Sequence, residues 1–249
     1  MEKASNFAEK CRNIAENYKT IYVLGAWGWP MTDSAKARCL AEQAFNRKPE
    51  RQEKIMSTSQ GVFGFDCVGL IKGVLWGWDG SGEIYGGAGY AVNGVPDKNA
   101  DQVIALCREV SADFGHIQVG EVVWFAGHIG VYVGDGLVVE CTHRWSDGVQ
   151  LTRLTGRGWQ KHGKLPWVEY EETPLRTLRK GDTGEDVRAL QILLAGRGCK
   201  GKMFEAGYGS FGGNTEGAVK LYQQACGLPV TGVADMTTWL HLLGKGDGA

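Results

Sequence analysis

The sequence predicts an α+β domain followed by a small all-α module. Helical patterns of apolar residues come first, over residues 6–19, 67–76 and 101–110, and Val- and Tyr-rich segments with strand character follow between 121 and 142. Helices followed by consecutive antiparallel strands are typical of α+β proteins rather than of βαβ repeats. Residues 178–244 then return to helical periodicity. A chain of 249 residues is long enough for two unequal domains.

Each of these elements has its own local signal. Residues 6–19 place small and apolar side chains along one side of a helix, namely Phe7, Cys11, Ile14 and Ala15. Asp101 is a suitable start for the helix at 101–110. The Asp-Gly pair in the turn Gly134–Gly136 is flanked by β-type segments, which predicts a hairpin of two antiparallel strands.

Composition and charge exclude several classes of protein. The net charge is −1, from 27 basic and 28 acidic residues, which gives no electrostatic reason to bind nucleic acid or an anionic membrane. Apolar stretches such as 122–126 are far shorter than the ~20 residues of a membrane helix. The N-terminal segment lacks the apolar core of a secretory signal, so we expect synthesis in the cytoplasm without membrane insertion. The seven scattered cysteines contain no CxxC pair, which favours free thiols.

The clearest domain boundary is the polar segment Glu169–Pro174. Its proline disfavours a helix immediately before it, and the hydrophobic pattern changes after it. We therefore expect a first domain over residues 1–172, a linker over 173–177 and a second domain over 178–249. A domain of about 70 residues is within the size range that can fold alone.

The second domain is expected to consist of three short helices. Over 182–194, apolar residues recur at helical spacing, and Asp182 or Thr183 can cap the start. Residues 214–223 repeat the same plan of polar cap, acidic residue, small residue, valine and basic residue. A third helix begins at Asp235.

Cys67 is the candidate nucleophile. Gly64 allows a turn, Asp66 is a good helix N-cap, and Cys67 takes the first helical position. There its sulfur faces the positive end of the helix dipole and free backbone N–H groups, which favour the thiolate over the thiol. The thiolate is the form that attacks a carbonyl carbon. The competing interpretation is that Cys67 is one more buried cysteine.

His128 is the candidate partner among five histidines. It begins a strand of small and apolar residues, and flanking glycines permit close approach of the backbone. We expect Val133 to pair with Leu137 across the turn. This register puts Glu140 diagonally across from His128, where a carboxylate would hold the imidazole tautomer and stabilise its cation. A slip of one residue would put His143 opposite His128 instead, so His143 is the reserve candidate.

These segments resemble the NlpC-type cell-wall cysteine peptidases, which are papain-like in architecture. The family is recognised by an Asp-Cys pair at a helix start, a Gly-Asp pair before a β run and a His-x-Gly-x-Tyr-x-Gly strand. The matching segments here are Asp66–Leu70, Val119–Phe125 and His128–Gly134. Glu140 stands twelve positions after His128, at the family's third polar position, where many relatives carry a second histidine.

The resemblance implies that Cys67 attacks an amide carbonyl of the peptidoglycan stem peptide, while His128 protonates the leaving amine. Glu140 would orient the imidazole ring. Tyr22 matches the family's upstream tyrosine and would help the Cys67 N–H to stabilise the oxyanion. The implied activity is a D-glutamyl–diamino-acid endopeptidase without cofactor or metal. An N-acetylmuramoyl-L-alanine amidase using the same residues remains the alternative.

Segments 178–194, 209–223 and 228–239 are similar to the three-helix peptidoglycan-binding domain. This resemblance implies that the second domain tethers the enzyme to bacterial peptidoglycan and raises the local substrate concentration. A wall hydrolase without an export signal resembles a phage or prophage endolysin, which reaches the wall through a holin. The alternative from another class is a wall-binding protein whose first domain is inactive.

Two further patterns point to other kinds of site. Residues 207–212 fit GxGxxG, but no strand precedes them and no βαβ unit surrounds them, so we expect no dinucleotide site. The run Glu-Cys-Thr-His at 140–143 could supply metal ligands, with Cys67 and His128 completing a zinc site. Alternation along a strand puts Cys141 and His143 on the opposite face from Glu140, which argues against a metal site.

Overall fold

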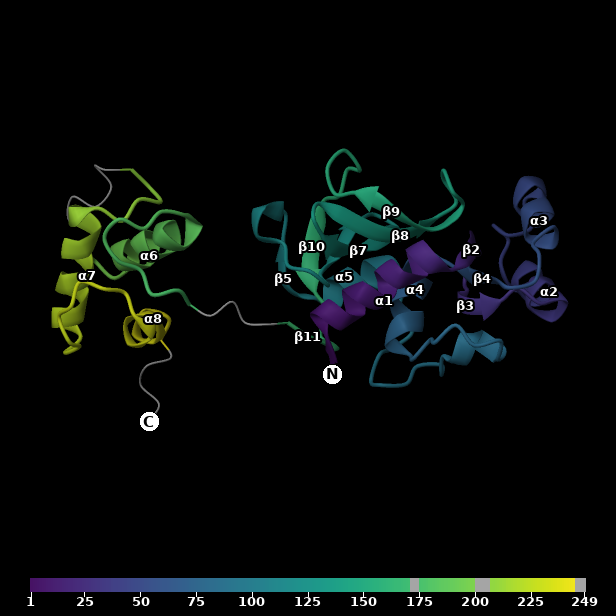
Figure 1. The fold of residues 1–249 in the computed structure, drawn as a ribbon, viewed down its shortest axis with the longest axis horizontal. Helices are drawn as coiled ribbons and strands as arrows, with labels where there is room; N and C mark the ends of the chain where they lie inside the picture. Colours follow the sequence, from purple (N-terminus) through teal and green to yellow (C-terminus); the bar gives the residue numbers. More distant parts are fainter. Residues whose placement is uncertain (171–174, 200–206, 245–249) are drawn as a thin grey trace. The chain divides into compact units, whose positions relative to one another are not determined.

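The computed structural model describes residues 1–170, 175–199 and 207–244, and the chain forms two compact units, Met1–Glu171 and Glu172–Ala249 (Figure 1). Eight α-helices and three sheets lie within the described residues, so the architecture mixes helices and strands. Part of the expected boundary segment and linker, residues 171–174, lies outside the described residues. The same holds for 200–206 and 245–249 of the expected second domain.

The first unit is built on a six-stranded antiparallel sheet in the order β5-β10-β6-β7-β8-β9. Its strands are β5 (Arg108–Ser111), β10 (Lys161–Lys164), β6 (Val122–Phe125), β7 (His128–Gly134), β8 (Leu137–Thr142) and β9 (Gly148–Arg153). A smaller sheet has the order β2-β4-β3, with β2 (Lys19–Tyr22), β4 (Val62–Phe65) and β3 (Trp27–Pro30). The short strands β1 (Glu2–Lys3) and β11 (Val168–Glu169) pair in parallel.

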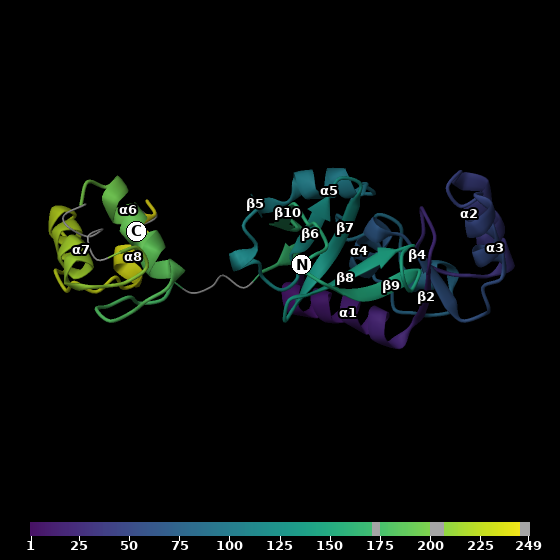
Figure 2. The same cartoon turned by 90° about the horizontal axis from the view of Figure 1, so that it is seen from above.

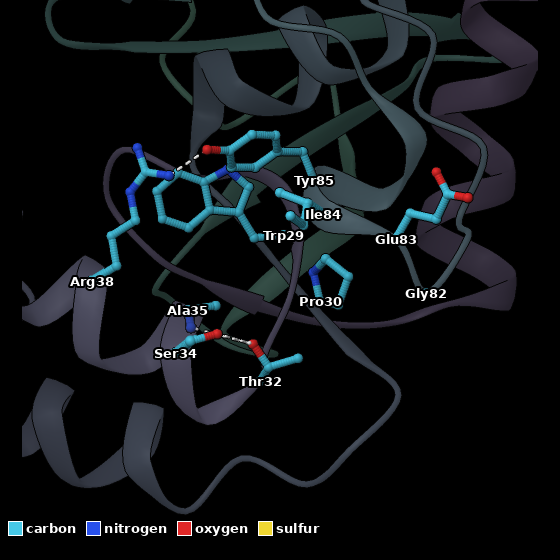
Figure 3. A pocket seen from close by; sticks show the side chains of 10 residues that line it. All are labelled: Trp29, Pro30, Thr32, Ser34, Ala35, Arg38, Gly82, Glu83, Ile84 and Tyr85. Atoms are coloured by element: carbon cyan, nitrogen blue, oxygen red, sulfur yellow. Dashed lines mark hydrogen bonds between the residues drawn. The ribbon is translucent and has the colours of Figure 1, made fainter.

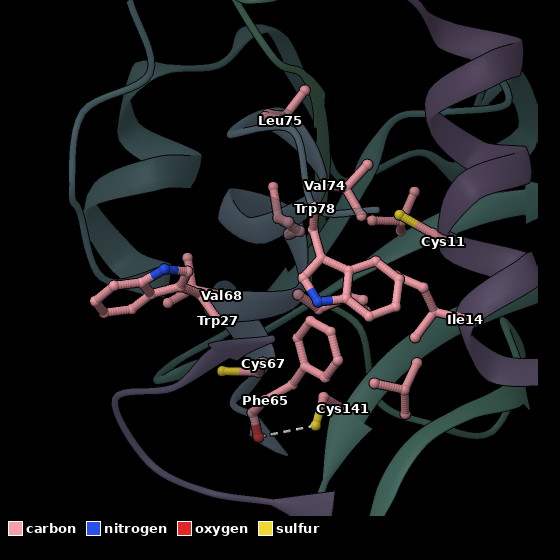
Figure 4. Packing of buried hydrophobic residues seen from close by; sticks show 14 of the residues in the cluster. Cys11, Ile14, Trp27, Phe65, Cys67, Val68, Val74, Leu75, Trp78 and Cys141 are labelled. Carbon is pink, nitrogen blue, oxygen red and sulfur yellow. Dashed lines mark hydrogen bonds between the residues drawn. The ribbon is translucent and has the colours of Figure 1, made fainter. Parts of the chain in front are cut away.

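Helices pack against both sheets of the first unit. They are α1 (Ala4–Asn17), α2 (Asp33–Glu42), α3 (Pro49–Met56), α4 (Cys67–Leu75) and α5 (Ala100–Leu106), with the 3₁₀ turns η1 (Ile84–Gly87) and η2 (Phe114–His116). Both α1 and α4 pack on β7 and β8. Figures 1 and 2 show α2 and α3 together at the end of the unit away from β5. The buried faces of α1 and α4 meet in the core drawn in Figure 4, where Cys11 and Ile14 lie near Val74 and Trp78.

Two glycines let α4 lie directly against the backbone around β3. A Cβ atom at Gly69 would come within 2.0 Å of the Ala26 carbonyl oxygen. At Gly73 the corresponding distance to the Trp27 carbonyl oxygen would be 2.4 Å. Only residues without a side chain fit at these two positions, so the sequence pattern Gly-x-x-x-Gly fixes how closely the helix start approaches the smaller sheet.

The turn between β7 and β8 is tighter than the sequence suggests. Gly134, and not Val133, pairs with Leu137, so only Asp135 and Gly136 remain in the turn. Their φ angles of 54° and 68° are the positive pair of a type I′ turn, which Asp-Gly favours. Val133 is therefore an extra residue in its strand, a β-bulge.

Beyond this bulge the expected register is confirmed. Gly130 pairs with Glu140, which leaves His128 diagonally across from Glu140 on the same face. A Cβ atom at Gly130 would lie 3.3 Å from that of Glu140. The missing side chain at Gly130 therefore leaves room for the imidazole to reach the carboxylate.

The helix expected over 101–110 begins earlier and ends sooner. Asn99, and not Asp101, is its N-cap: the Asn99 side chain accepts from the Gln102 N–H, and Gln102 reaches back to the Asn99 N–H. The helix ends at Leu106, and residues 108–111 form β5 instead. The smaller sheet, α2, α3, β9 and β10 have no counterpart in the sequence prediction.

The second unit contains three α-helices within its described residues: α6 (Glu185–Gly196), α7 (Gly213–Ala225) and α8 (Met236–Leu242). Gly184, rather than Asp182 or Thr183, precedes α6. Asp182 instead accepts a hydrogen bond from the N–H of Arg179. Asp235 caps α8 as expected, through the N–H of Thr238. The three helices share a separate core of apolar side chains. Each helix within the described residues is too short or too polar to cross a bilayer.

Candidate active site

Cys67 lies where β4 ends and α4 begins. Asp66 caps this helix, because its Oδ1 accepts from the Gly69 N–H at 2.5 Å. The other oxygen, Oδ2, accepts from the Gly25 N–H at 2.7 Å. The Asp66 carboxylate therefore joins the start of α4 to the loop that follows Tyr22, and this sets the distance between the thiol and that loop.

The Cys67 thiol has a raised pKa in this structure. Burial first, and the neighbouring Asp66 carboxylate second, raise its pKa to about 12. Hydrogen bonds from backbone N–H groups, that of Ile129 first, act in the opposite direction. The expectation of a thiolate at the helix start is therefore wrong for this state. The N–H groups at the helix start do favour the thiolate. Because the side chain is only 7% exposed, however, desolvation disfavours the thiolate more strongly.

His128 is bonded to Glu140, as the sheet register requires. The distance from His128 Nε2 to Glu140 Oε2 is 2.6 Å, and Glu140 is fully buried. Burial alone raises the pKa of this carboxyl, but three side-chain hydrogen bonds outweigh it and lower the pKa to about 2. The donors are His128, Arg157 and Thr152. Glu140 is therefore ionised and accepts hydrogen bonds through both oxygens.

Two residues around this pair carry no signal in the sequence. Arg157 donates from Nε to Glu140 Oε1 at 2.8 Å and from Nη2 to Oε2 at 2.7 Å. Trp159 stacks on the His128 ring, with centroids 5.6 Å apart and planes 12° from parallel. Phe125 packs on His128 as well, at 5.0 Å. Arg157 and Trp159 lie in the Gly-Arg-Gly-Trp loop after β9. In the sequence this loop resembles an ordinary surface turn, but in the fold it lies against Glu140 of β8.

Tyr22 is the last residue of β2 and stands near Cys67. Burial raises its pKa, and Cys67 is the next largest cause, so the hydroxyl keeps its proton. Arg51 fixes the position of Tyr22 by donating to its carbonyl oxygen, while binding both carboxylate oxygens of Asp147 at 2.7 and 2.6 Å. The Tyr22 ring is thus anchored through its own backbone, and no described residue bonds its hydroxyl.

His143, the reserve candidate, makes different contacts. Its ring packs on Tyr22 and Phe45, both at 5.5 Å, and the residue is exposed. Burial of the ring and the nearby Arg51 guanidinium lower its pKa. The structure thus places Tyr22 near Cys67, Ile129 (the residue after His128) near the same sulfur, Glu140 against the His128 imidazole, and His143 beside Tyr22.

An open groove begins next to the thiol. Its volume is about 630 Å³, and its lining includes Asp66 and Val68, the residues on either side of Cys67. Six charged side chains of both signs line it: Arg38, Lys72, Lys98, Glu42, Asp66 and Asp97. Lys72 and Asp97 form an ion pair within it. The groove can therefore accept an extended ligand that carries both carboxylates and an amine.

A metal centre has no matching geometry in the part of the chain that the structure describes. No three His, Cys, Asp or Glu side chains there come together as ligands would. In β8, Cys141 points into the core, where its sulfur contacts the Phe65 carbonyl oxygen at 3.2 Å, whereas Glu140 bonds His128. The strand alternation expected for these neighbours is observed.

Residues 183–242 match the family model described as "Putative peptidoglycan binding domain". This match supports a cell-wall-associated function. Comparison with curated proteins gives no match.

Three solved structures show partial similarity. The SleB N-terminal domain is 34% identical, with 29% of this chain and 94% of that chain covered and a TM-score of 0.25. A peptidoglycan-binding protein from Clostridioides difficile is 21% identical, with 47% and 59% covered and a TM-score of 0.25. NlpC2 from Trichomonas vaginalis is 13% identical, with 66% and 48% covered and a TM-score of 0.36. The chain thus spans about half the length of the last two, and TM-scores below 0.5 do not establish a shared fold.

Proposed function

We propose that this chain is a peptidoglycan hydrolase that cleaves an amide bond of the stem peptide with Cys67 as nucleophile and His128 as base. One arrangement carries the proposal. The Ile129 N–H lies near enough to the Cys67 sulfur to lower the thiol pKa, and the residue before it, His128, is held through Nε2 by the ionised Glu140. The open groove lined by Asp66 and Val68 begins at the same helix start.

The Glu140 contact determines which imidazole nitrogen can act as a base. An ionised carboxylate only accepts hydrogen bonds, so Nε2 of His128 carries the proton. In the neutral ring Nδ1 then has a free lone pair, and no described residue bonds it. His128 can therefore take the thiol proton of Cys67 during attack, which suits a thiol whose pKa is about 12.

The proposed reaction has two halves. As the Cys67 sulfur bonds the amide carbon, its proton passes to His128 Nδ1, and the oxyanion is met by the Tyr22 hydroxyl and the Cys67 N–H. His128 then gives this proton to the leaving amine, and the C–N bond breaks to leave a thioester. Water attacks the thioester with His128 again as base, which releases the acid and restores the thiol.

The substrate class follows from the second unit together with the groove. The family match at 183–242 favours a polymeric wall substrate, and the mixed charges of the groove suit a stem peptide. We propose the D-glutamyl–diamino-acid bond as the one cleaved. The N-acetylmuramoyl-L-alanine bond is the alternative, with the same residues and chemistry. A chain made in the cytoplasm would then act as an endolysin after holin-assisted release.

A second candidate function is a wall-binding protein with an inactive first domain. The observation that favours it is the state of Cys67, which is only 7% exposed and has a pKa of about 12. In this case the first unit would hold a stem peptide without cleaving it.

Digestion of purified sacculi distinguishes the two functions. The wild-type chain is expected to release soluble fragments, and Cys67→Ala is expected to lower the rate by roughly a thousandfold or more. Cys107→Ala, a change of a partly buried cysteine that lines neither groove, serves as the control and should keep the wild-type rate. Mass spectrometry of the new termini identifies the bond. Release by Cys67→Ala at the wild-type rate would rule out the thiol mechanism, and no release by the wild type would favour the binding protein.

A further inference from the structure

A second groove meets the first one at two shared residues. Its volume is about 390 Å³, and it lies between the start of α2, Trp29 and the segment around η1 (Figure 3). Arg38 and Tyr85 line both grooves, so they form the wall between them. The groove beside the start of α4 is therefore bounded, on this side, by a guanidinium and a phenol.

The Arg38 side chain is held on three sides. Its Nε donates to Glu42 Oε1 at 2.7 Å, and its Nη1 donates to the Tyr85 hydroxyl. The guanidinium carbon lies 4.7 Å from the centroid of the Trp29 ring, and Figure 3 shows the two groups next to each other. Nη2 has no partner among the residues that the structure describes. An exposed arginine is thus fixed in orientation with one edge open.

Tyr85 is held in an unusual backbone conformation that places its hydroxyl at this point. Its φ of 62° and ψ of 20° lie in the left-handed region, which bulky aromatic residues rarely adopt. Packing against Trp27 at 5.0 Å and Trp29 at 5.7 Å holds the ring there. Because the hydroxyl oxygen accepts from Arg38, its own proton is free to be donated elsewhere.

Among the described residues, the ion pair of Arg38 is made through Nε and not at the open Nη2 edge. Glu42 is already bonded to the Nε side of the guanidinium. Of the other acidic side chains that line the first groove, Asp97 is paired with Lys72 and bonded by Tyr90 at 3.0 Å, and Asp66 accepts from the Gly25 and Gly69 N–H groups. A planar arginine with an open edge and a hydroxyl donor beside it matches the two oxygens of a carboxylate, which can accept from both donors at once.

We infer that Arg38 and Tyr85 form a carboxylate-binding subsite that recognises a free carboxylate of the stem peptide bound along the groove from Cys67. This inference rests on the proposed substrate class and extends it to substrate selection. A carboxamide at the same place has only one acceptor oxygen, and its NH₂ group is a donor that cannot bond the N–H groups of the guanidinium. The subsite therefore favours stem peptides with the free acid over their amidated forms.

Binding to Cys67→Ala tests this subsite without turnover. The probes are the tripeptide L-Ala-γ-D-Glu-meso-diaminopimelate and two derivatives, one amidated at the glutamyl α-carboxylate and one at a diaminopimelate carboxylate. One derivative is expected to bind about tenfold more weakly than the acid, because a charge-assisted bond at a solvent-exposed site is lost. Which derivative loses affinity identifies the carboxylate that is read.

Second-site variants assign the effect to Arg38. Added to Cys67→Ala, Arg38→Gln should remove the preference for the acid, and Tyr85→Phe should reduce it. Arg153→Gln makes the same charge change on an exposed residue outside both grooves and should preserve the preference. Melting temperatures establish that all variants are folded.

Two results would overturn the inference: a preference for the acid that survives Arg38→Gln, or no measurable binding of any of the three peptides. The outcome is separable from the proposed function. If the wild type cleaves sacculi but Arg38→Gln leaves the acid preference intact, the subsite fails and the hydrolase stands. If the acid preference depends on Arg38 but nothing is cleaved, the subsite stands and the hydrolase fails.

Discussion

The Glu140 carboxylate receives four hydrogen bonds, from His128, Thr152 and twice from Arg157. The Arg157 guanidinium offsets its negative charge, so Glu140 acts chiefly as a fixed acceptor that sets the His128 tautomer. Trp159 and Phe125 restrict the ring further. At the scale of single residues, the imidazole is oriented before any substrate arrives.

Replacement of Glu140 by glutamine tests this orienting role. The carboxamide cannot accept from His128 and from both Arg157 nitrogens at once, so kcat/KM is expected to fall by roughly a hundredfold. Removing one partner of the buried Arg157 pair should also lower the free energy of unfolding by about 3 kcal/mol. Steady-state kinetics and urea unfolding measure the two effects. Thr152→Val, which removes one neutral donor, should have the smaller effect on both, and equal effects of the two variants would contradict the role.

The lowered pKa of Glu140 predicts how stability depends on pH. The folded-state value of about 2 lies below the ordinary 4.5, so the ionised carboxylate stabilises the folded state above pH 4.5. That contribution, on the order of 3 kcal/mol, is lost as the pH falls from 4.5 toward 2. Urea unfolding at pH 7 and pH 3 should show a smaller loss for Glu140→Gln than for the wild type. The same loss in both proteins would show that another group is responsible.

The raised pKa of Cys67 predicts slow alkylation of the resting protein. A pKa of about 12 instead of 9 leaves about a thousandfold less thiolate at pH 7 than an unperturbed cysteine has. Iodoacetamide labelling of Cys67, followed by peptide mass spectrometry, should therefore be slow at pH 7 and accelerate steeply above pH 9. Fast labelling at pH 6 to 7 would instead indicate a preformed thiolate–imidazolium pair.

Among the elements, the close approach of α4 to the smaller sheet sets the geometry of the helix start. Gly69→Ala would place a methyl group 2.0 Å from the Ala26 carbonyl oxygen and push the helix away from the loop that Asp66 holds. We expect a destabilisation of about 1–3 kcal/mol and a large loss of activity. Gly217→Ala in α7, where nothing lies within 4 Å, is the matched control and should be neutral or stabilising. Equal unfolding midpoints for the two variants would contradict this interpretation.

Local patterns predict some elements of this chain and not others. The buried side of α1 and the β7–β8 hairpin follow from periodicity and the Asp-Gly turn, and the hairpin register leads from His128 to Glu140. The smaller sheet escapes prediction because its strands have four residues each and two of them contain glycine. Arg157 and Trp159 escape because their contacts with Glu140 and His128 exist only in the folded chain. The raised pKa of the Cys67 thiol does not follow from the sequence, because burial depends on residues that are distant along the chain, whereas the helix start is a local feature.

At the scale of the whole molecule, each of the two units has its own buried core. Residues 174–249 should therefore be removable without unfolding the first unit. The truncated chain is expected to bind sacculi more weakly in pelleting assays, while it cleaves small muropeptides at nearly the full-length rate. Equal loss of binding and of muropeptide cleavage would show that the second unit helps to fold or assemble the active site.

Detection of the thioester intermediate tests the central claim most directly. The wild-type chain is mixed with a soluble muropeptide, quenched in acid during turnover and analysed as intact protein and as peptides. The proposed mechanism predicts added mass equal to the acyl part of the cleaved stem peptide, located on Cys67 and absent from Cys67→Ala. Muropeptide cleavage that proceeds at the same rate in both proteins, with no such adduct in either, would contradict it.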